Sequence, residues 1–220
     1  MKEKLYKIIT AGLSLGGVAA LLLLPIARFA ANVSAVLIGD ISADFKINAL
    51  WIFRLIKDKQ TGVDSLDSLL SGETLSGASI WENLGEIRVR LIIFATAVAL
   101  CLLLAVAVAV LVLVLKKSKG VILPLSAAGF FSAVTASAAF SSVSAPFLSG
   151  KTSLSDVLGS LASLASIEIQ RFSLGSAVTL VLVLFVLIFV ACAAFMLADF
   201  IAANSKPKKK KKKPAAAKKK

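Results

Sequence analysis

Apolar positions in this chain gather into four long runs, at about residues 8–28, 91–115, 121–147 and 177–201. A helix needs about 20 apolar residues to cross a hydrocarbon core of roughly 30 Å, and each run is long enough. The pattern therefore predicts an all-α transmembrane fold, a membrane bundle of four helices within residues 1–203. The remaining residues are expected to form two loops and a disordered tail, at residues 29–90, 148–176 and 204–220.

Basic residues set the expected orientation of this bundle, because Lys and Arg resist translocation across a membrane. They cluster before the first run, between the second and third runs, and in the tail, which carries ten lysines. The three clusters share one side only if the spans alternate in direction. We therefore expect an integral protein of the plasma or cell membrane, with both termini in the cytoplasm and both loops outside.

The first run has a second interpretation, as a cleaved signal peptide. Lysines precede an apolar core, and Val33-Ser34-Ala35 is a small-x-small cleavage pattern. The run is longer than a usual signal core, however, and Gly12 and Gly16 have the GxxxG spacing that suits packing between membrane helices. Cleavage would leave three spans with the same orientation.

The third run differs from the others because it is rich in Ala, Ser and Thr and only moderately hydrophobic. Membrane helices associate through close backbone packing and Ser/Thr hydrogen bonds, so we expect this helix to be surrounded by the other three. Its expected packing residues are Gly129 and Ala133. The hydroxyl stripe from Ser126 to Ser144 is also the one candidate for a transport path.

The first outer loop shows period-two alternation. Odd positions of residues 33–55 are mostly apolar, and even positions of residues 41–48 are polar. Such alternation predicts strands with one buried face, and Gly39-Asp40 predicts the hairpin turn between two of them. We therefore expect a small extracytoplasmic β-sheet in this loop, and a further strand over residues 87–91, where the alternation returns.

The second outer loop shows helical spacing instead, with apolar residues at 154, 157, 158, 161, 164 and 165. This spacing predicts an amphipathic helix on the sheet or on the membrane surface. Its polar face lacks the Lys and Arg of a lipid-binding helix, which favours packing on the sheet.

Residues that carry chemistry are scarce. The chain has no histidine, which excludes imidazole-based zinc sites and Ser-His-Asp triads. Cys101 and Cys192 lie inside spans, where each is expected to be a small buried apolar residue. No phosphate-binding glycine loop, CxxC pair or carboxylate cluster appears. We expect no enzyme, cofactor, metal or small-molecule substrate; an enzyme using Ser or Asp on an outer loop is a distant alternative.

The net charge of +13 comes mostly from the lysine-rich tail. A lysine run next to a span attracts anionic lipid headgroups, each charge contributing about 1 kcal/mol, or simply anchors the topology. Nucleic-acid binding is not expected of a chain held in a bilayer. Asp199 is expected at the cytoplasmic interface, facing lysines. The expected headgroup ligands are Lys208, Lys209, Lys210, Lys211, Lys212 and Lys213.

The layout resembles that of the claudin and peripheral-myelin-protein-like four-pass proteins. Ala49-Leu50-Trp51 stands where that group has a Gly-Leu-Trp motif, and Asp67-Ser68-Leu69-Leu70 is similar to a later segment of the claudin loop. Arg88 or Arg90 resembles the arginine before the second span. The chain departs from the group in lacking the paired cysteines of this loop.

The resemblance implies a non-enzymatic role in adhesion, barrier formation or modulation of a partner membrane protein. An exposed sheet edge would make the contact, by strand pairing or side-chain docking, with a second copy or another membrane protein. The alternative is a small transporter or channel subunit with a path along the third span. The expected interaction residues are Phe45, Trp51, Phe53, Arg88 and Arg90.

Overall fold

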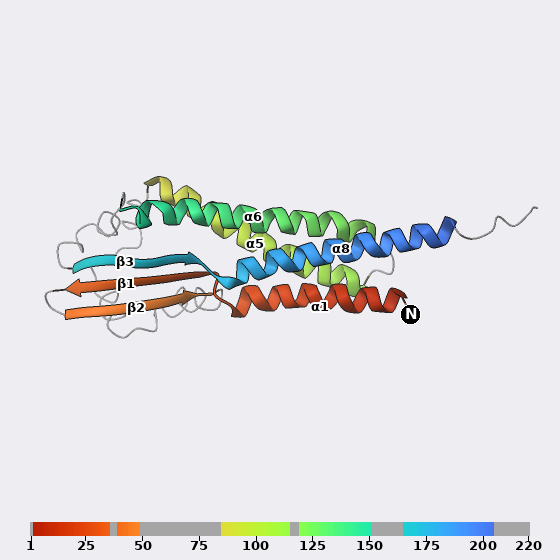
Figure 1. Ribbon diagram of the computed structural model, residues 1–220, viewed down its shortest axis with the longest axis horizontal. Helices are drawn as coiled ribbons and strands as arrows, with labels where there is room; N and C mark the ends of the chain where they lie inside the picture. The colour runs from red at the N-terminus through yellow and green to blue at the C-terminus, as the bar shows by residue number, and fades with distance from the viewer. Residues whose placement is uncertain (1, 36–38, 49–84, 115–118, 151–164, 205–220) are drawn as a thin grey trace, which may run out of the picture.

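In the computed structural model, four helices form an elongated bundle and three strands extend from one of its ends (Figure 1). The structure describes residues 2–35, 39–48, 85–114, 119–150 and 165–204. The helices are α1 (Lys2–Leu23), α5 (Gly85–Val114), α6 (Lys119–Leu148) and α8 (Ser176–Asn204). The strands are β1 (Ala27–Ala35), β2 (Gly39–Ile47) and β3 (Ala165–Leu174).

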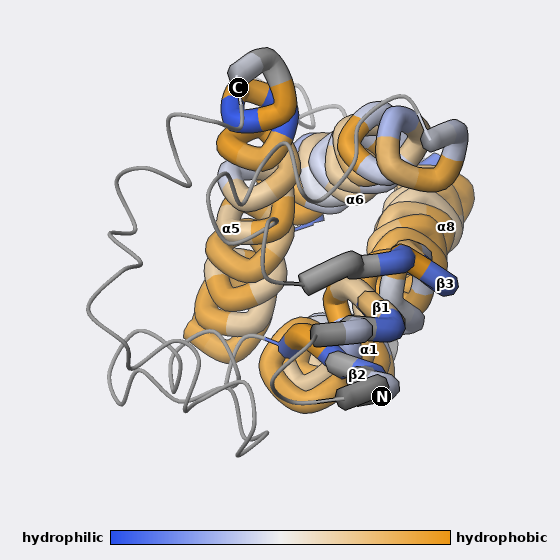
Figure 2. Tube along the Cα trace, turned by 90° about the vertical axis from the view of Figure 1, so that its left-hand side faces the viewer, coloured by the Kyte–Doolittle hydropathy of each residue, from blue (hydrophilic) through white to orange (hydrophobic). Residues whose placement is uncertain are grey.

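All four helices are long and apolar enough to cross a membrane, which confirms the predicted four-span bundle. Hydrophobic residues predominate along these helices (Figure 2). The start of α1, the start of α6 and the end of α8 lie at one end, and the sheet lies at the other (Figure 1). Two of the three basic clusters thus begin at the end opposite the sheet, and the tail leaves α8 from that end.

The helices pack in a ring, in which α1 and α6 each contact α5 and α8. The expectation that the third span would be surrounded is therefore wrong, because α6 occupies one corner of this ring. The most apolar window of α6 is 33% buried, the same share as in α5. Its buried face is made mostly of small residues, while Phe131, Val134 and Thr135 are exposed on the other.

Small and hydroxylated residues pack α1 against its neighbours. Tyr6, Thr10 and Ser14 recur at four-residue spacing and are almost fully buried. The Ser14 hydroxyl donates a 2.6 Å hydrogen bond to the Ala105 carbonyl of α5. The Tyr6 hydroxyl lies 3.3 Å from the Cys192 sulfur of α8. Polar side chains thus link α1 to both helices that it contacts.

The sheet has the strand order β2-β1-β3, and both pairings are antiparallel. The hairpin of β1 and β2 confirms the predicted sheet, but its turn precedes Gly39-Asp40, which begin β2. The third strand, β3, comes from the second outer loop, where we expected a helix. Residues 151–164 carry most of the helical pattern and lie outside the described residues. Residues 87–91 form the first turns of α5 and no strand, since they continue directly into its apolar run.

A single β-bulge keeps the apolar residues of β3 on one face. Phe172 pairs opposite Phe29, and Ile169 pairs opposite Ala31, so one residue, Gln170, is extra between them. Without this extra residue, the two halves of β3 would present their apolar side chains to opposite faces.

The sheet is joined rigidly to the ends of two membrane helices. α1 ends at Leu23, shortly before Pro25, because the proline ring prevents the helix from continuing. The Pro25 carbonyl accepts a 3.0 Å hydrogen bond from the Ala177 amide at the start of α8. Ile26 donates to the Ile47 carbonyl at 2.7 Å and accepts from the Gly175 amide at 2.8 Å. These bonds fix the base of all three strands against α1 and α8. Residues 27 and 28, which were expected in the first span, belong to β1.

Candidate functional site

One face of the sheet is mostly polar; its side chains on β2 are exposed, and those on the central strand β1 are mostly half-buried. Its residues form three rows across the strands, because side chains two residues apart share a face. Both acidic and basic side chains occur on β2 and on β3, so this face has mixed charge. The rows, each running from β2 through β1 to β3, are Lys46-Arg28-Ser173, Asp44-Ala30-Arg171 and Ser42-Asn32-Glu168.

The opposite face of the sheet packs on the bundle through aromatic rings. The Phe172 ring on β3 lies 5.7 Å from Phe29, 5.0 Å from Phe140 and 6.0 Å from Phe147. These edge-on contacts connect the sheet to the last third of α6. Among the described residues, the polar face is therefore the face of the sheet that does not pack on the bundle.

The sequence-predicted interaction residues fall in several places. Trp51 and Phe53 lie outside the described residues, as does the Ala49-Leu50-Trp51 motif. Phe45 lies in β2, where its backbone pairs with Phe29. Sequence reasoning missed the β3 residues of the polar face, because the alternation changes phase within residues 165–174.

The two arginines of this set lie in the first turns of α5. Arg90 donates a 2.8 Å hydrogen bond to the Ser142 carbonyl, which ties α5 to α6. Arg88 is half-buried. Neither lies in a strand, since α5 begins at Gly85.

The predicted packing glycines also differ in their surroundings. Gly129 is buried, and a methyl group added there would overlap the Phe185 ring of α8. Ala133 is fully buried one turn further along α6. Gly12 is exposed with open space around it, while Gly16 touches only the tip of Leu184. Of the predicted packing glycines, Gly129 is therefore the one at which an added methyl group would push two helices apart.

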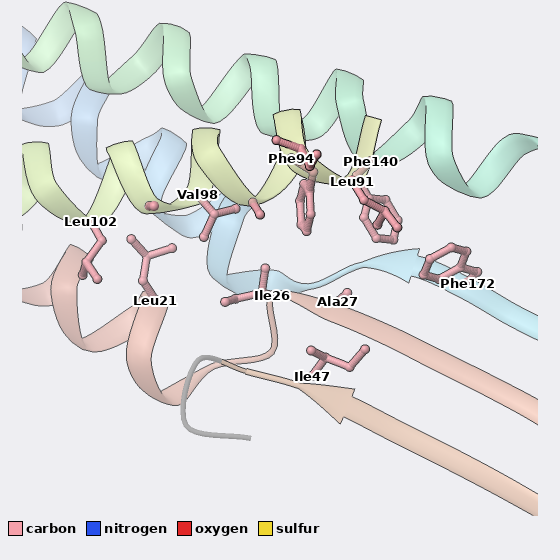
Figure 3. Close-up of a pocket in the computed structure, with 13 residues that line it drawn as sticks. Leu21, Ile26, Ala27, Ile47, Leu91, Phe94, Val98, Leu102, Phe140 and Phe172 are labelled. Carbon is pink, nitrogen blue, oxygen red and sulfur yellow. The ribbon is translucent and has the colours of Figure 1, made fainter. Parts of the chain in front are cut away.

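An apolar cavity lies where the bundle meets the sheet (Figure 3). Its volume is about 770 Å³, and every described residue that lines it is Ala, Ile, Leu, Val or Phe. Leu21 comes from α1, Ile47 from β2, and Phe94 with six other residues from α5. No sequence pattern predicted this cavity, because six separate segments contribute its described walls.

A charged cluster lies at the end of the bundle opposite the sheet. The Lys119 ammonium at the start of α6 pairs with the Asp199 carboxylate near the end of α8. It also lies 5.3 Å from the centre of the Tyr6 ring and 5.8 Å from that of Phe195. Asp199 faces a lysine, as expected, and the cluster joins α1, α6 and α8. The tail lysines Lys208–Lys213 lie outside the described residues.

Most of the hydroxyls of α6 bond within their own helix. Ser126 donates to the Leu123 carbonyl at 2.8 Å, and Ser137 donates to the Ala133 carbonyl at 3.0 Å. Thr135 and Ser141 do the same on the exposed side. These hydroxyls are satisfied without water, so their geometry gives no support to a transport path.

Within the described ranges, no three His, Cys, Asp or Glu side chains come together as a metal site would require. Cys101 and Cys192 are both free and buried.

No protein-family model, no curated protein and no solved structure matches this chain. The comparisons therefore identify no family, and the resemblance to claudins rests on the sequence motifs alone. What the structure shows is a four-span membrane protein with a small antiparallel sheet.

Proposed function

We propose that this protein is a non-enzymatic membrane protein that organises its membrane, adheres to an opposing one, or modulates a partner through its sheet. The observation that carries the proposal is the rigid joint between the sheet and two spanning helices. The Ile26–Ile47, Gly175–Ile26 and Ala177–Pro25 backbone hydrogen bonds leave no flexible linker between β1 or β3 and the bundle. A rigidly held sheet presents a preformed surface, and a preformed surface loses less entropy on binding.

The composition of the polar face supports a protein partner. Arg28, Lys46 and Arg171 supply positive charge, and Asp44 and Glu168 supply negative charge. Mixed charge of this kind gives orientation and specificity to a contact between proteins. Among the described residues, β2 pairs only with β1, so its outer edge is a second place where an extended segment could dock.

The proposed orientation places the sheet outside and both termini in the cytoplasm. It rests on the basic residues, since Lys4, Lys7 and Lys119 all lie at the end of the bundle opposite the sheet. In this orientation the tail lysines would face the anionic lipids of the cytoplasmic leaflet. The partner would be a second copy of the chain or another membrane protein.

Photocrosslinking in the native membrane tests the proposal. The photoreactive amino acid p-benzoylphenylalanine replaces Ser42 or Glu168, two exposed positions in one row of the polar face. The matched control position is Leu103, which is 65% exposed on α5 and reports neighbours that approach through the lipid. The adducts are identified by mass spectrometry.

We expect one defined protein adduct from both sheet positions and a lower yield of it from Leu103. Equal or higher yield at Leu103 would mean that contact occurs through the helices. An absence of protein adducts at both sheet positions would contradict the proposal.

A further inference from the structure

The cavity between the bundle and the sheet has the properties of a lipid-chain site. Its volume of about 770 Å³ lies in the usual range of ligand pockets, roughly 300–1,000 Å³. Phe94, Val98 and Leu102 project from α5 toward Leu21 and Ile26 across this space (Figure 3). Because the described residues that line the cavity include no polar side chain, a water molecule there would find few hydrogen-bond partners among them.

The depth of the cavity matches one half of a bilayer. Its α5 residues run from Leu91 to Leu102, within the candidate span Ile87–Val114. A rise of about 1.5 Å per residue makes this stretch about 16 Å long, against a hydrocarbon core of roughly 30 Å. The cavity therefore occupies the hydrocarbon half nearest the sheet.

One wall of the cavity continues into the outer surface of the bundle. Ile92 lines the cavity and is 49% exposed, and Ala95 and Ala99 also line it and are exposed. Exposed apolar residues of the same helix, Ile93 and Leu103, lie on the surface beside them. In a spanning helix such a surface faces lipid, so the cavity is continuous with the lipid-facing side of α5.

We propose that this cavity binds an acyl chain of a bilayer lipid from the leaflet next to the sheet. An acyl chain is the apolar occupant available at this depth and along this opening. It would supply the packing contacts that the cavity walls lack when empty. The bound chain would wedge between α5 and the base of the sheet, and it would stabilise the angle between them. This proposal is independent of the partner of the polar face.

The test uses a phosphatidylcholine whose acyl chain carries a diazirine. The full chain is reconstituted with this probe, washed extensively in detergent, irradiated and mapped by mass spectrometry. A cavity-filling variant, Ala95→Trp, is compared with Ala193→Trp, which adds the same side chain at an exposed position of α8.

We expect adducts on Leu91, Phe94 and Val98 to survive washing, at least five-fold enriched over adducts on Leu103. Ala95→Trp should lower the cavity adducts at least five-fold, and Ala193→Trp should leave them unchanged. Mapping of the unmodified chain decides the matter even if Ala95→Trp does not fold.

Three results would overturn the proposal. If washing removed the lipid adducts equally at all positions, the probe would have bound only to the outer surface of the bundle. A benzophenone at Ala99 that captured residues 49–56 of the same chain would mean that the protein fills its own cavity. Capture of a second copy there would make the cavity a contact between chains.

Discussion

Replacing Gly175 by alanine is expected to break the joint between the sheet and the membrane helices. Gly175 is buried at the step from β3 to α8, and a methyl group there would overlap the backbone carbonyl of Pro25. Backbone atoms cannot rotate away as a side chain can, so Pro25 and Ile26 must move. That movement disturbs two hydrogen bonds, from Gly175 to Ile26 and from Ala177 to Pro25.

The magnitude follows from these contacts. Each hydrogen bond contributes about 0.5–1.5 kcal/mol, and the overlap itself costs about 1–3 kcal/mol. The opposing gain, from lower entropy of the unfolded chain, is about 0.4–1 kcal/mol, so the overlap dominates. We expect Gly175→Ala to lower the free energy of unfolding by about 2–5 kcal/mol.

Two measurements check this prediction. Unfolding in mixed detergent and SDS micelles gives the free energy, and hydrogen exchange locates the change. Faster exchange is expected at the amides of Ile26, Gly175 and Ala177. The matched control is Gly12→Ala, where an added methyl group meets no atom within 4 Å. A change below about 0.5 kcal/mol with unaltered exchange at these amides would refute the reasoning.

Three further predictions concern the bundle. Gly129→Ala should lower the free energy of unfolding by about 1–3 kcal/mol, because the new methyl group overlaps the Phe185 ring; SDS titration measures it. Ser14→Ala should cost about 0.6 kcal/mol in the same titration, because an interhelical hydrogen bond to α5 is lost. A double-mutant cycle of Lys119→Ala and Asp199→Ala should give a coupling below about 1 kcal/mol that falls with salt, because Asp199 is 61% exposed.

Matched changes separate these effects from general damage. Gly12→Ala is again the control variant for Gly129→Ala. An equal loss of unfolding free energy at both positions would contradict the packing argument. Ser141→Ala is the control variant for Ser14→Ala, because the Ser141 hydroxyl donates a hydrogen bond within its own helix and is exposed. Equal costs there would mean that the bond to α5 contributes nothing. A coupling unaffected by salt would mean that the Lys119–Asp199 pair is shielded from solvent.

The membrane bundle was predictable because its signal is long and repeated. Each span needs about 20 apolar residues, and such runs are rare by chance. The ends of the elements were harder to place. Apart from Arg28, residues 27–31 are apolar and could continue the first span, and Pro25 marks the end of α1. Five alternating residues at 87–91 were too few to distinguish a strand from the first turns of a helix.

The third strand was missed because its alternation changes phase. Ile167 and Ile169 occupy odd positions, and Phe172 and Leu174 occupy even positions, so no single period-two pattern covers β3. The bulge at Gln170 reconciles the two halves, and a bulge leaves little trace in one sequence. The cavity was beyond prediction for another reason. Its shape depends on the placement of α5 relative to the sheet, which no local pattern encodes.

The central claim is that a rigid sheet lies outside the membrane, on the side opposite both termini. Labelling with a membrane-impermeant maleimide in sealed right-side-out vesicles tests it most directly. Cys101 and Cys192 are 2% and 0% exposed, so they add little background. We predict that Ser42→Cys reacts at once and that Asn204→Cys reacts only after permeabilisation. Reaction of both before permeabilisation, or of Asn204→Cys alone, would contradict the account.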